Sequence, residues 1–301
     1  MPYWLVSSCR SSLMFLPQYQ QTAALWVRTI LLYITLPFLA LNSYVLGMTI
    51  GPFLPYPKRF KLIIGTFCHS VVWLCKHVCG IHYHVKGLEN LPKDNKGYVI
   101  MSKHQSAWET LFLQNIFDPN TVVIKKEAFY IPFFGWGIAL LNPIFVNRKK
   151  GSQAIEQIIK QGSERLKRGE DILIFPEGTR VNVGERKPFK KGGALLACEA
   201  GADIIPIALN SGEHWNNKRW LKLPGTIQVV IGPVIATQGR SWEQVNAQAE
   251  QWINQQVDMI SQVPYQGELP QPDAGFGFNP QLLVSNAMKA GKEWFNQWRR
   301  W

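Results

Sequence analysis

The sequence is short of acidic residues and of charge in general. Among its 301 residues, 20 are Asp or Glu against 32 Lys or Arg, which gives a formal net charge of +12 with only 17% charged residues. Apolar residues make up 47% of the chain, so burial can offset the entropy cost of ordering, and a disordered protein is excluded. The sequence also has no Gly-X-Y period, heptad array or internal repeat, which excludes fibrous and solenoid folds.

Three motifs that mark large enzyme classes are missing as well. There is no G-x-S-x-G elbow of a serine hydrolase, no Walker A loop and no Rossmann glycine pattern. The excess positive charge and the 12 Trp point instead to nucleic acid or to an anionic membrane surface. No RNA-binding signature occurs, and the aromatic residues concentrate in apolar segments, so we expect membrane lipids and no nucleic acid as partners.

Cysteines are few and odd in number. The five residues Cys9, Cys68, Cys75, Cys79 and Cys198 do not suit a secreted disulfide framework, and a reducing compartment fits better. A metal cluster is conceivable from a group of five residues in one short stretch: Cys75, His77, Cys79, His82 and His84. Their spacing misses the usual zinc pattern, so we interpret the cysteines as part of a buried helix and the last two histidines as the outer face of a strand.

A long uncharged segment lies near the N-terminus. No charged residue occurs from Thr29 to Pro57, and the part from Thr29 to Gly51 would make a helix of about 34 Å, long enough to cross a membrane. Pro37 and Asn42-Ser43 interrupt this run, so a kinked or re-entrant helix is an alternative to a straight one. A second apolar stretch, from Leu62 to Cys75, reaches only about 21 Å and is expected to lie in one leaflet. A pair of core helices in a soluble protein is the alternative.

Basic residues follow this segment and are rare before it. Lys58, Arg59 and Lys61 come directly after it, whereas Arg10 and Arg28 are the only charged residues upstream. The positive-inside bias therefore places the rest of the chain on the cytoplasmic side of the membrane. The run is too long and begins too far from Met1 for a cleavable signal peptide.

Strand and helix patterns alternate from about residue 81 onwards. Seven short apolar segments have the composition of strands: 81–85, 97–102, 121–125, 143–147, 171–175, 204–209 and 226–231. Helical spacing occurs at 107–117, 152–167 and 193–200, and Ser241 with Gln244 forms a capping box for a last helix. This order predicts an α/β fold with a mixed, largely parallel central sheet flanked by helices, preceded by the membrane-embedded helical element.

Three segments follow from these patterns. Residues 1–80 form the membrane-associated helical segment, 81–262 the α/β domain, and 263–301 a Pro/Gly-rich linker with an amphipathic, Trp-rich tail. The tail has three Trp in its last eight residues, beside two Arg, a composition typical of a membrane interface. A helix that packs back on the domain is the alternative.

A histidine and a carboxylate mark the junction between a predicted strand and a predicted helix. His104 is followed five positions later by Glu109, and strand-to-helix junctions of α/β sheets are usual ligand sites. In such a pair the carboxylate fixes the imidazole tautomer, and the other ring nitrogen accepts a substrate proton. Glu109 can also cap the helix together with Ser106, and the two roles are compatible.

Two arginines each close a predicted strand. Arg148 ends the segment NPIFVNR, and Arg180 ends IFPEGTR, with Lys190 and Lys191 nearby in sequence. Both arginines should lie at the same sheet edge as His104 if the strands are parallel. One guanidinium group can donate two parallel hydrogen bonds to the oxygens of a phosphate group, so this edge is a candidate site for a phosphorylated substrate.

Together, four segments resemble a known family. HQSAWE, PIFVNR, FPEGTR and IIPIAL, in this order, are similar to the four blocks of the glycerolipid acyltransferases, most closely the bacterial 1-acyl-sn-glycerol-3-phosphate acyltransferases. The resemblance covers roughly residues 60–235. It implies a bacterial inner (cytoplasmic) membrane enzyme whose active site faces the cytoplasm. The implied reaction moves a fatty acyl group from acyl-CoA or acyl-carrier protein to the sn-2 hydroxyl of lysophosphatidic acid, giving phosphatidic acid.

The resemblance also assigns catalytic roles. It makes His104 the general base and Glu109 its orienting partner. Because a thioester is already activated, no nucleophilic side chain, metal or bound cofactor is expected. Backbone N–H groups from Gln105 to Ala107 are candidates for stabilising the oxyanion. The family usually has Asp where this chain has Glu109.

Binding roles follow from the other blocks of the resemblance. It implies that Arg148 and Arg180 bind the phosphate group of the acceptor. It also places three residues of the third block in the acceptor site: Glu177, Gly178 and Thr179. Pro206 is assigned to the hydrophobic side of the acyl-donor site. The second block usually opens with Gly, and here Asn142 and Pro143 stand in its place.

Other functions stay open on the sequence alone. The acceptor can be another lyso-lipid, glycerol 3-phosphate or a lipid A precursor; the His-x4-Glu form favours the last, and the intact FPEGTR block opposes it. A membrane or nucleic-acid binding protein without activity, and a hydrolase that releases free fatty acid, are the alternatives from different classes.

Overall fold

The computed structural model describes residues 23–130, 136, 139–141, 143–147, 151–216 and 218–266. All of these lie within one compact unit that extends to Glu268. Cys9, Asn142, Arg148 and the predicted C-terminal tail are outside the described residues.

Seven strands form one sheet with the order β1-β7-β6-β2-β5-β3-β4. Their bounds are β1 Ile81–Lys86, β2 Val99–Ser102, β3 Asn120–Lys125, β4 Ile144–Val146, β5 Asp171–Ile174, β6 Ile204–Leu209 and β7 Gly225–Ile231. Neighbouring strands are parallel, except that β6 and β7 are antiparallel. The mixed, largely parallel sheet is therefore confirmed, and every predicted strand segment contains a strand.

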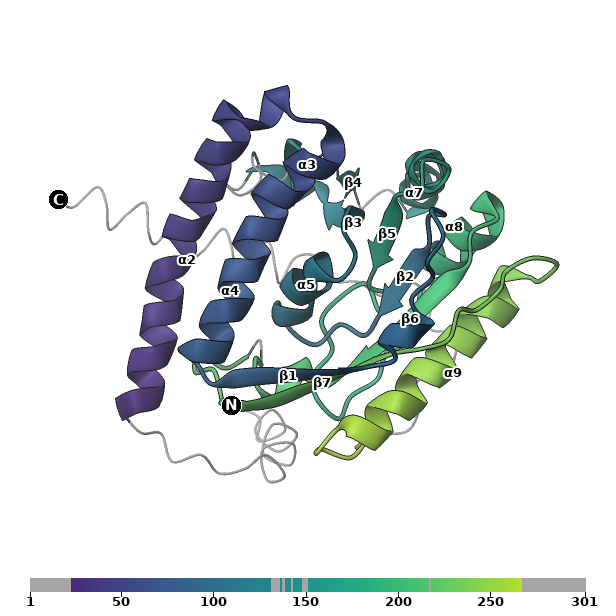
Figure 1. Ribbon diagram of the computed structural model, residues 1–301. Helices are drawn as coiled ribbons and strands as arrows, with labels where there is room; N and C mark the ends of the chain where they lie inside the picture. The colour runs from purple at the N-terminus through teal and green to yellow at the C-terminus, as the bar shows by residue number, and fades with distance from the viewer. Residues whose placement is uncertain are drawn as a thin grey trace, which may run out of the picture. The chain divides into compact units, whose positions relative to one another are not determined.

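Helices cover both faces of this sheet (Figure 1). One face is covered by α7 (Gly151–Leu166), α8 (Gly192–Ala200) and α9 (Trp242–Ile260), and the other by α2 (Ala23–Thr49), α4 (Thr66–His77) and α5 (Trp108–Phe112). Shorter helical turns are α3 Tyr56–Phe60, the π-helix η2 Lys61–Gly65, and the 3₁₀ turns η1 Gly51–Phe53, η3 Leu88–Asn90, η4 Leu113–Asn115, η5 Lys126–Tyr130 and η7 Ser211–Glu213. The predicted capping box at Ser241 is present at the start of α9.

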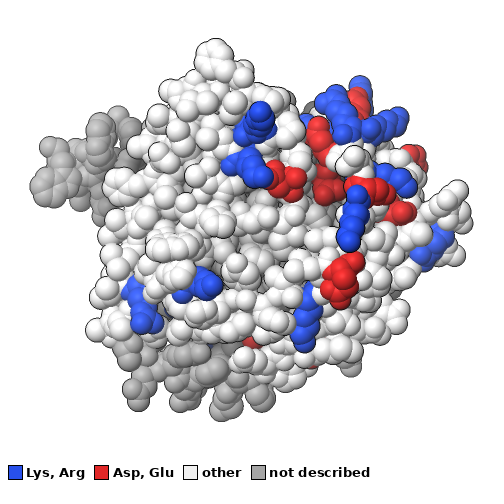
Figure 2. Space-filling view, viewed as in Figure 1, with Lys and Arg blue, Asp and Glu red and all other residues white. Residues whose placement is uncertain are grey.

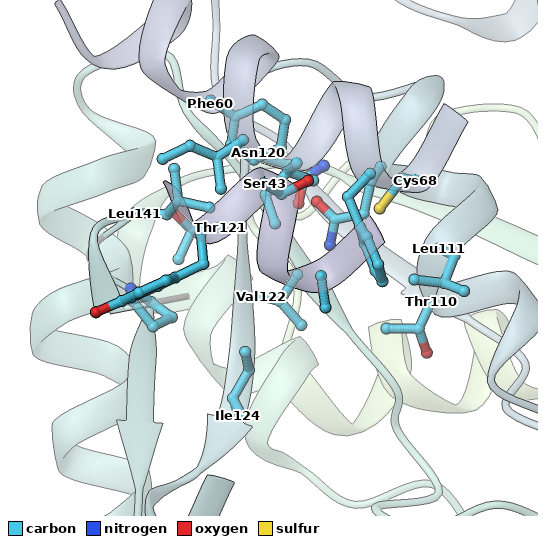
Figure 3. A pocket seen from close by; sticks show the side chains of 17 residues that line it. Ser43, Phe60, Cys68, Thr110, Leu111, Asn120, Thr121, Val122, Ile124 and Leu141 are labelled. Carbon is cyan, nitrogen blue, oxygen red and sulfur yellow. The ribbon is translucent and has the colours of Figure 1, made fainter. Parts of the chain in front are cut away.

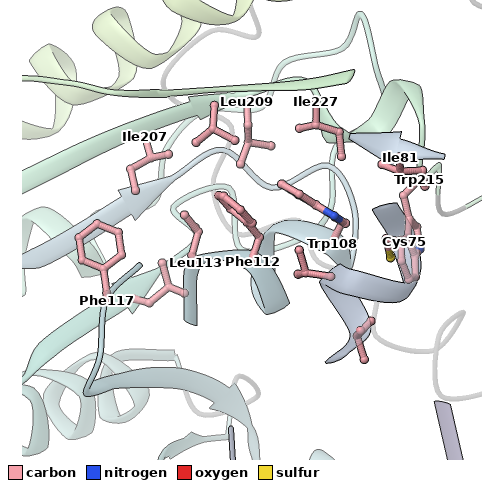
Figure 4. Close-up of a cluster of buried hydrophobic side chains, with 14 of the residues drawn as sticks. Cys75, Ile81, Trp108, Phe112, Leu113, Phe117, Ile207, Leu209, Trp215 and Ile227 are labelled. Carbon is pink, nitrogen blue, oxygen red and sulfur yellow. The ribbon is translucent and has the colours of Figure 1, made fainter. Parts of the chain in front are cut away.

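Alternation along the strands divides the core into two layers. Val99 and Met101 of β2 pack with α7, α8 and α9, whereas Ile100 packs with α4 and α5, as the two-residue period of a strand requires. Figure 4 shows the second layer, where Trp108 stacks on Phe112 with ring centroids 4.4 Å apart. Both faces of the sheet are thus buried, which is typical of parallel sheets.

Helix α5 is shorter than the sequence pattern predicts. The expected helix covers 107–117, but α5 ends at Phe112 and continues only as the 3₁₀ turn η4. The chain must reach β3 at Asn120, and Pro119 disfavours helical geometry at the residue before it. The turn therefore replaces the last part of the predicted helix.

The N-terminal helix presents an apolar face to the outside. Helix α2 is long and apolar enough to cross a membrane by length and composition, and along it large apolar side chains are exposed: Val27, Ile34, Phe38, Leu41, Val45 and Met48. The surface over α2 and α4 is largely uncharged, whereas acidic and basic side chains gather over α7 (Figure 2). Proteins rarely expose an apolar patch of this kind to water, so the face is consistent with membrane association.

The same helices also belong to the core of the α/β unit. Leu32 of α2 and Cys75 of α4 are fully buried in one cluster with Trp108 of α5 and Ile207 of β6. The predicted boundary at residue 80 stays a prediction. Across that boundary the packing is continuous.

A half-buried aspartate begins β5, at the end of the strand away from the predicted site. Asp171 Oδ1 accepts a hydrogen bond of 2.9 Å from the backbone N–H of Tyr98. Burial, assisted by the nearby Asp94 carboxylate, raises the pKa of Asp171 to about 6, although the Tyr98 N–H opposes the shift. Because this pKa lies above its unfolded value, the free energy of unfolding should fall as the pH rises from about 4 to 6.

We expect Asp171→Asn to raise the melting temperature at pH 7. The amide oxygen can still accept from Tyr98, while the buried charge is removed, and the shift corresponds to roughly 1 to 3 kcal/mol. Thermal unfolding of both proteins between pH 4 and pH 8 measures the effect. The difference should vanish near pH 4, where the parent carboxyl is protonated in the fold. A variant that is less stable at pH 7 would contradict this account.

Candidate active site

The carboxyl ends of three neighbouring strands meet at one place in the sheet. β2 lies between β5 and β6 and is parallel to both. The residues that directly follow these strands are therefore brought together, although they are far apart in sequence. His104 follows β2, Glu177 follows β5, and Ser211 follows β6. Such an edge is the usual ligand site of open α/β sheets.

His104 and Glu109 are in direct contact, as the sequence predicts. His104 Nδ1 lies 2.9 Å from Glu109 Oε1, and the histidine side chain is 14% exposed while the glutamate is fully buried. The His104 ring stacks on Phe175 with centroids 3.9 Å apart. Within the part of the chain that the structure describes, Nε2 has no hydrogen-bond partner. The ring is thus fixed through one nitrogen, and the other is available to a substrate.

Glu109 is surrounded by hydrogen-bond donors. Its Oε1 accepts from the backbone N–H groups of Gln105 and Ser106, at 2.7 and 2.6 Å. Its Oε2 accepts from the hydroxyl of Ser211 at 2.6 Å and from the hydroxyl of Ser106. Burial alone would raise the pKa of Glu109, but the hydrogen bonds and the His104 ring outweigh burial and lower it. The carboxylate therefore stays ionised beside the imidazole.

This network changes one expectation about the oxyanion. The backbone N–H groups of Gln105 and Ser106 were predicted candidates for stabilising it, but both point at Glu109. A donor already committed to a buried carboxylate cannot also bind an oxyanion without breaking that bond. The prediction is therefore wrong for these two groups. The longer side chain of Glu109, compared with Asp, lets the carboxylate fold back over its own turn.

The loop that carries the third sequence block, FPEGTR, lies against His104: the His104 N–H donates to Glu177, and the His104 ring stacks on Phe175. Glu177 is buried and forms an ion pair with Lys103, with Nζ and Oε1 3.0 Å apart. Gly178 has a φ of +68°, a backbone conformation that favours glycine. Thr179 is half-buried, and Arg180 is exposed on the same loop. Their roles toward an acceptor stay predictions.

The remaining predicted binding residues lie elsewhere or are not described. Arg148 follows β4, which is separated from β5 by β3, and it is outside the described residues. Pro206 is buried in β6, and its Cγ lies beside Gly232, where Trp252 of α9 also packs. The structure therefore places Pro206 in the layer under α9, and does not bring it to His104.

The structure has an apolar cavity of about 210 Å³, whose wall includes neither His104 nor Glu109. It lies between α2, α4, α5 and β3, and its wall begins with Thr110 and Leu111, directly after Glu109 (Figure 3). Val122 and Ile124 of β3 and Cys68 of α4 form other parts of the wall. An apolar, elongated ligand group would fit this space.

Sequence reasoning missed Lys103, Phe175 and Ser211. Ser211 is 102 residues from Glu109, and the signal that could have found it is its position directly after the β6 strand. The histidines and cysteines of the conceivable metal cluster do not converge: Cys75 and Cys79 are buried, whereas His77, His82 and His84 are exposed. No group of three metal-ligand side chains occurs among residues that the structure describes.

Comparisons with known proteins agree with this geometry. A family model described as acyltransferase matches residues 82–210. A 1-acyl-sn-glycerol-3-phosphate acyltransferase of Pseudomonas aeruginosa is 44% identical over 249 residues, which cover 82% of this chain and 96% of the relative. One from Saccharomyces cerevisiae is 34% identical over 195 residues, 63% of each chain.

The fold has a counterpart among solved structures. The crystal structure of the 1-acyl-sn-glycerophosphate (LPA) acyltransferase PlsC from Thermotoga maritima aligns with a TM-score of 0.59 and covers 76% of this chain and 97% of that one. At 22% identity this likeness supports the fold alone. The family is shown by sequence, because the Pseudomonas relative matches over nearly its whole length. This chain therefore belongs to the acyltransferase family that contains the 1-acyl-sn-glycerol-3-phosphate acyltransferases named above.

Proposed function

We propose that this acyltransferase moves a fatty acyl group from an acyl thioester to the free sn-2 hydroxyl of lysophosphatidic acid, giving phosphatidic acid. The observation that carries the proposal is the contact between His104 Nδ1 and the buried, ionised Glu109, with Nε2 left for a substrate. The donor is acyl-CoA or acyl-carrier protein. The relatives' names support the acceptor.

The reaction needs one base and no acyl-enzyme intermediate. His104 Nε2 takes the proton of the acceptor hydroxyl as its oxygen attacks the thioester carbonyl carbon. The carbon–sulfur bond of the resulting tetrahedral intermediate then breaks, and His104 returns the proton to the leaving sulfur, which departs as the thiol. Glu109 stabilises the imidazolium that exists between these two transfers. Bound metal or cofactor has no step in this scheme.

The charged and the apolar parts of the substrates are assigned to different places in the protein. Arg180, which is exposed on the loop after β5, and Arg148 would bind the phosphate of the acceptor. The cavity beside Thr110 would hold the acyl chain of the donor. Helix α2 would attach the enzyme to the bacterial inner membrane with the site on the cytoplasmic side, so that lipid substrates reach it from the bilayer.

The test is transfer of labelled palmitoyl-CoA by membranes that contain the protein. We expect labelled phosphatidic acid with lysophosphatidic acid as acceptor, and no release of free fatty acid when the acceptor is omitted. Label in the product only with glycerol 3-phosphate, another lyso-lipid or a lipid A precursor would replace the proposed acceptor. Free fatty acid in all samples would indicate a hydrolase and overturn the proposal. Acyl-carrier protein donors are tested in parallel.

The acyl-chain cavity makes a separate prediction. We expect Val122→Phe to lower kcat/KM for palmitoyl-CoA about tenfold or more and to leave an octanoyl donor much less affected, because the ring would fill part of a small space. Val122→Ala at the same position is the control and should keep palmitoyl transfer within about twofold. An equal loss for both chain lengths would show that the cavity does not hold the chain.

A further inference from the structure

A buried lysine directly precedes the histidine of the site. Lys103 is 1% exposed and lies at the end of β2, between Ser102 and His104. Its Nζ is 3.0 Å from Oε1 of Glu177, whose side chain is fully buried. Taking two charges out of water costs several kcal/mol per ion, so a pair like this contributes little net stability.

The same carboxylate oxygen also faces the backbone of His104. The His104 N–H donates to Glu177 Oε1 at 3.4 Å, and the His104 carbonyl oxygen accepts from the N–H of Val181 at 2.8 Å. The ring stacks on Phe175. Residues 175–181 thus contact His104 at its N–H, its carbonyl and its ring, and the oxygen at the first of these contacts is the one that pairs with Lys103.

The orientation of Glu177 depends on Lys103. Within the described ranges, Glu177 Oε2 has no hydrogen-bond partner, and Lys103 Nζ makes no hydrogen bond of regular geometry, so the attraction between the two charges orients the carboxylate. A further carboxylate, Glu250 of α9, is close enough that Glu177 contributes, after burial, to raising the pKa of Glu250. Without Lys103 the two acidic groups would repel each other, and the Glu177 side chain would move.

We infer that Lys103 and Glu177 are a positioning pair that fixes the backbone of His104, and so aims its ring at the substrate hydroxyl. This inference rests on the proposed function, because it assigns the pair to the base of that reaction. It differs from the predicted role of Glu177 in the acceptor pocket. A positioning pair should affect kcat, whereas a residue of the acceptor pocket should affect the KM for the acceptor.

The test uses neutral side chains of similar shape. K103M alone leaves Glu177 as an unpaired buried charge and is expected to lower the melting temperature. The decisive proteins are therefore K103M/E177Q, whose amide oxygen can still accept from His104, and K103M/E177L, which offers no acceptor. Both lack the ion pair, so they differ in the contact to His104 and not in charge. Thermal unfolding checks that each is folded at the assay temperature.

We expect kcat to fall in the order parent, K103M/E177Q, K103M/E177L, with about tenfold or more between the last two and with KM for both substrates within about twofold. Hydrogen exchange of the His104 amide, which needs no substrate, should be at least about tenfold faster in K103M/E177L than in the parent. Equal kcat and equal exchange in the two double variants would overturn the inference, as would a changed acceptor KM with unchanged kcat. Failure of the proposed function is distinct: the parent would make no phosphatidic acid, while the exchange rates would still decide the positioning.

Discussion

Replacing His104 with alanine is expected to lower kcat about 10²- to 10⁴-fold, because general-base catalysis typically contributes this much to the rate. The folded state should change little. The His104 side chain lies at the edge of the core, 14% exposed, and its removal opens a space to solvent and not a sealed cavity. Measurement of kcat and KM with palmitoyl-CoA and lysophosphatidic acid, beside thermal unfolding, gives both quantities.

A matched control for this variant is His82→Ala. His82 is exposed on β1, at the edge of the sheet, and its replacement should leave kcat unchanged within about twofold. If His104→Ala kept most of the activity while folded, His104 would not be the base, and the reaction would need another proton acceptor. If both histidine variants lost activity equally, the loss would reflect a general effect on the protein.

Much of the fold was open to prediction because the strands are short, apolar and bounded by turn residues. The segments at 204–209 and 226–231 became β6 and β7 with shifts of at most one residue. Which strands pair with one another, and in which direction, could not be predicted from these patterns. Sequence alone gave no reason for β7 to run antiparallel to β6 while pairing parallel with β1, since register and direction depend on contacts between distant segments.

In the site, local relations were predictable and distant ones were not. His104 and Glu109 are five residues apart, and a single turn suffices to join them. Ser211 reaches Glu109 only because β6 and β2 are parallel neighbours. Likewise, Glu177 is 73 residues from His104. Lys103 showed no sign in the sequence of being buried, because a lysine usually stays exposed unless it is paired.

The face of the sheet on which Pro206 lies could not be predicted from the order of the sequence blocks. The block IIPIAL was assigned to the acyl-donor site from the resemblance, and its strand is indeed beside β2. The side on which each residue faces depends on strand parity. Pro206 has the parity of Ile204 and Ala208, which pack in the layer of α8 and α9, whereas the apolar cavity lies on the opposite face. The assignment from the block order could not decide between these faces.

Glu109→Gln is expected to lower kcat roughly 10²- to 10³-fold while preserving the local geometry. The amide oxygen can take the position of Oε1 and still accept from His104 Nδ1 and from the N–H groups of Gln105 and Ser106. The amide N–H₂ would take the position of Oε2, where the hydroxyls of Ser106 and Ser211 can rotate to accept. The imidazole tautomer is then kept, and only the negative charge is lost.

Comparison with Glu109→Asp separates charge from reach. Aspartate keeps the charge but is shorter by one methylene group, so it cannot meet all the donors that now surround Glu109, and a lower melting temperature should accompany its loss of kcat. Glu109→Gln should lose kcat with a smaller change in melting temperature. Glu89→Gln, at an exposed position, is the control and should leave both unchanged. If Glu109→Gln retained nearly full kcat, the carboxylate would serve only to orient His104, and the ionised state that its lowered pKa ensures would have no part in stabilising the imidazolium.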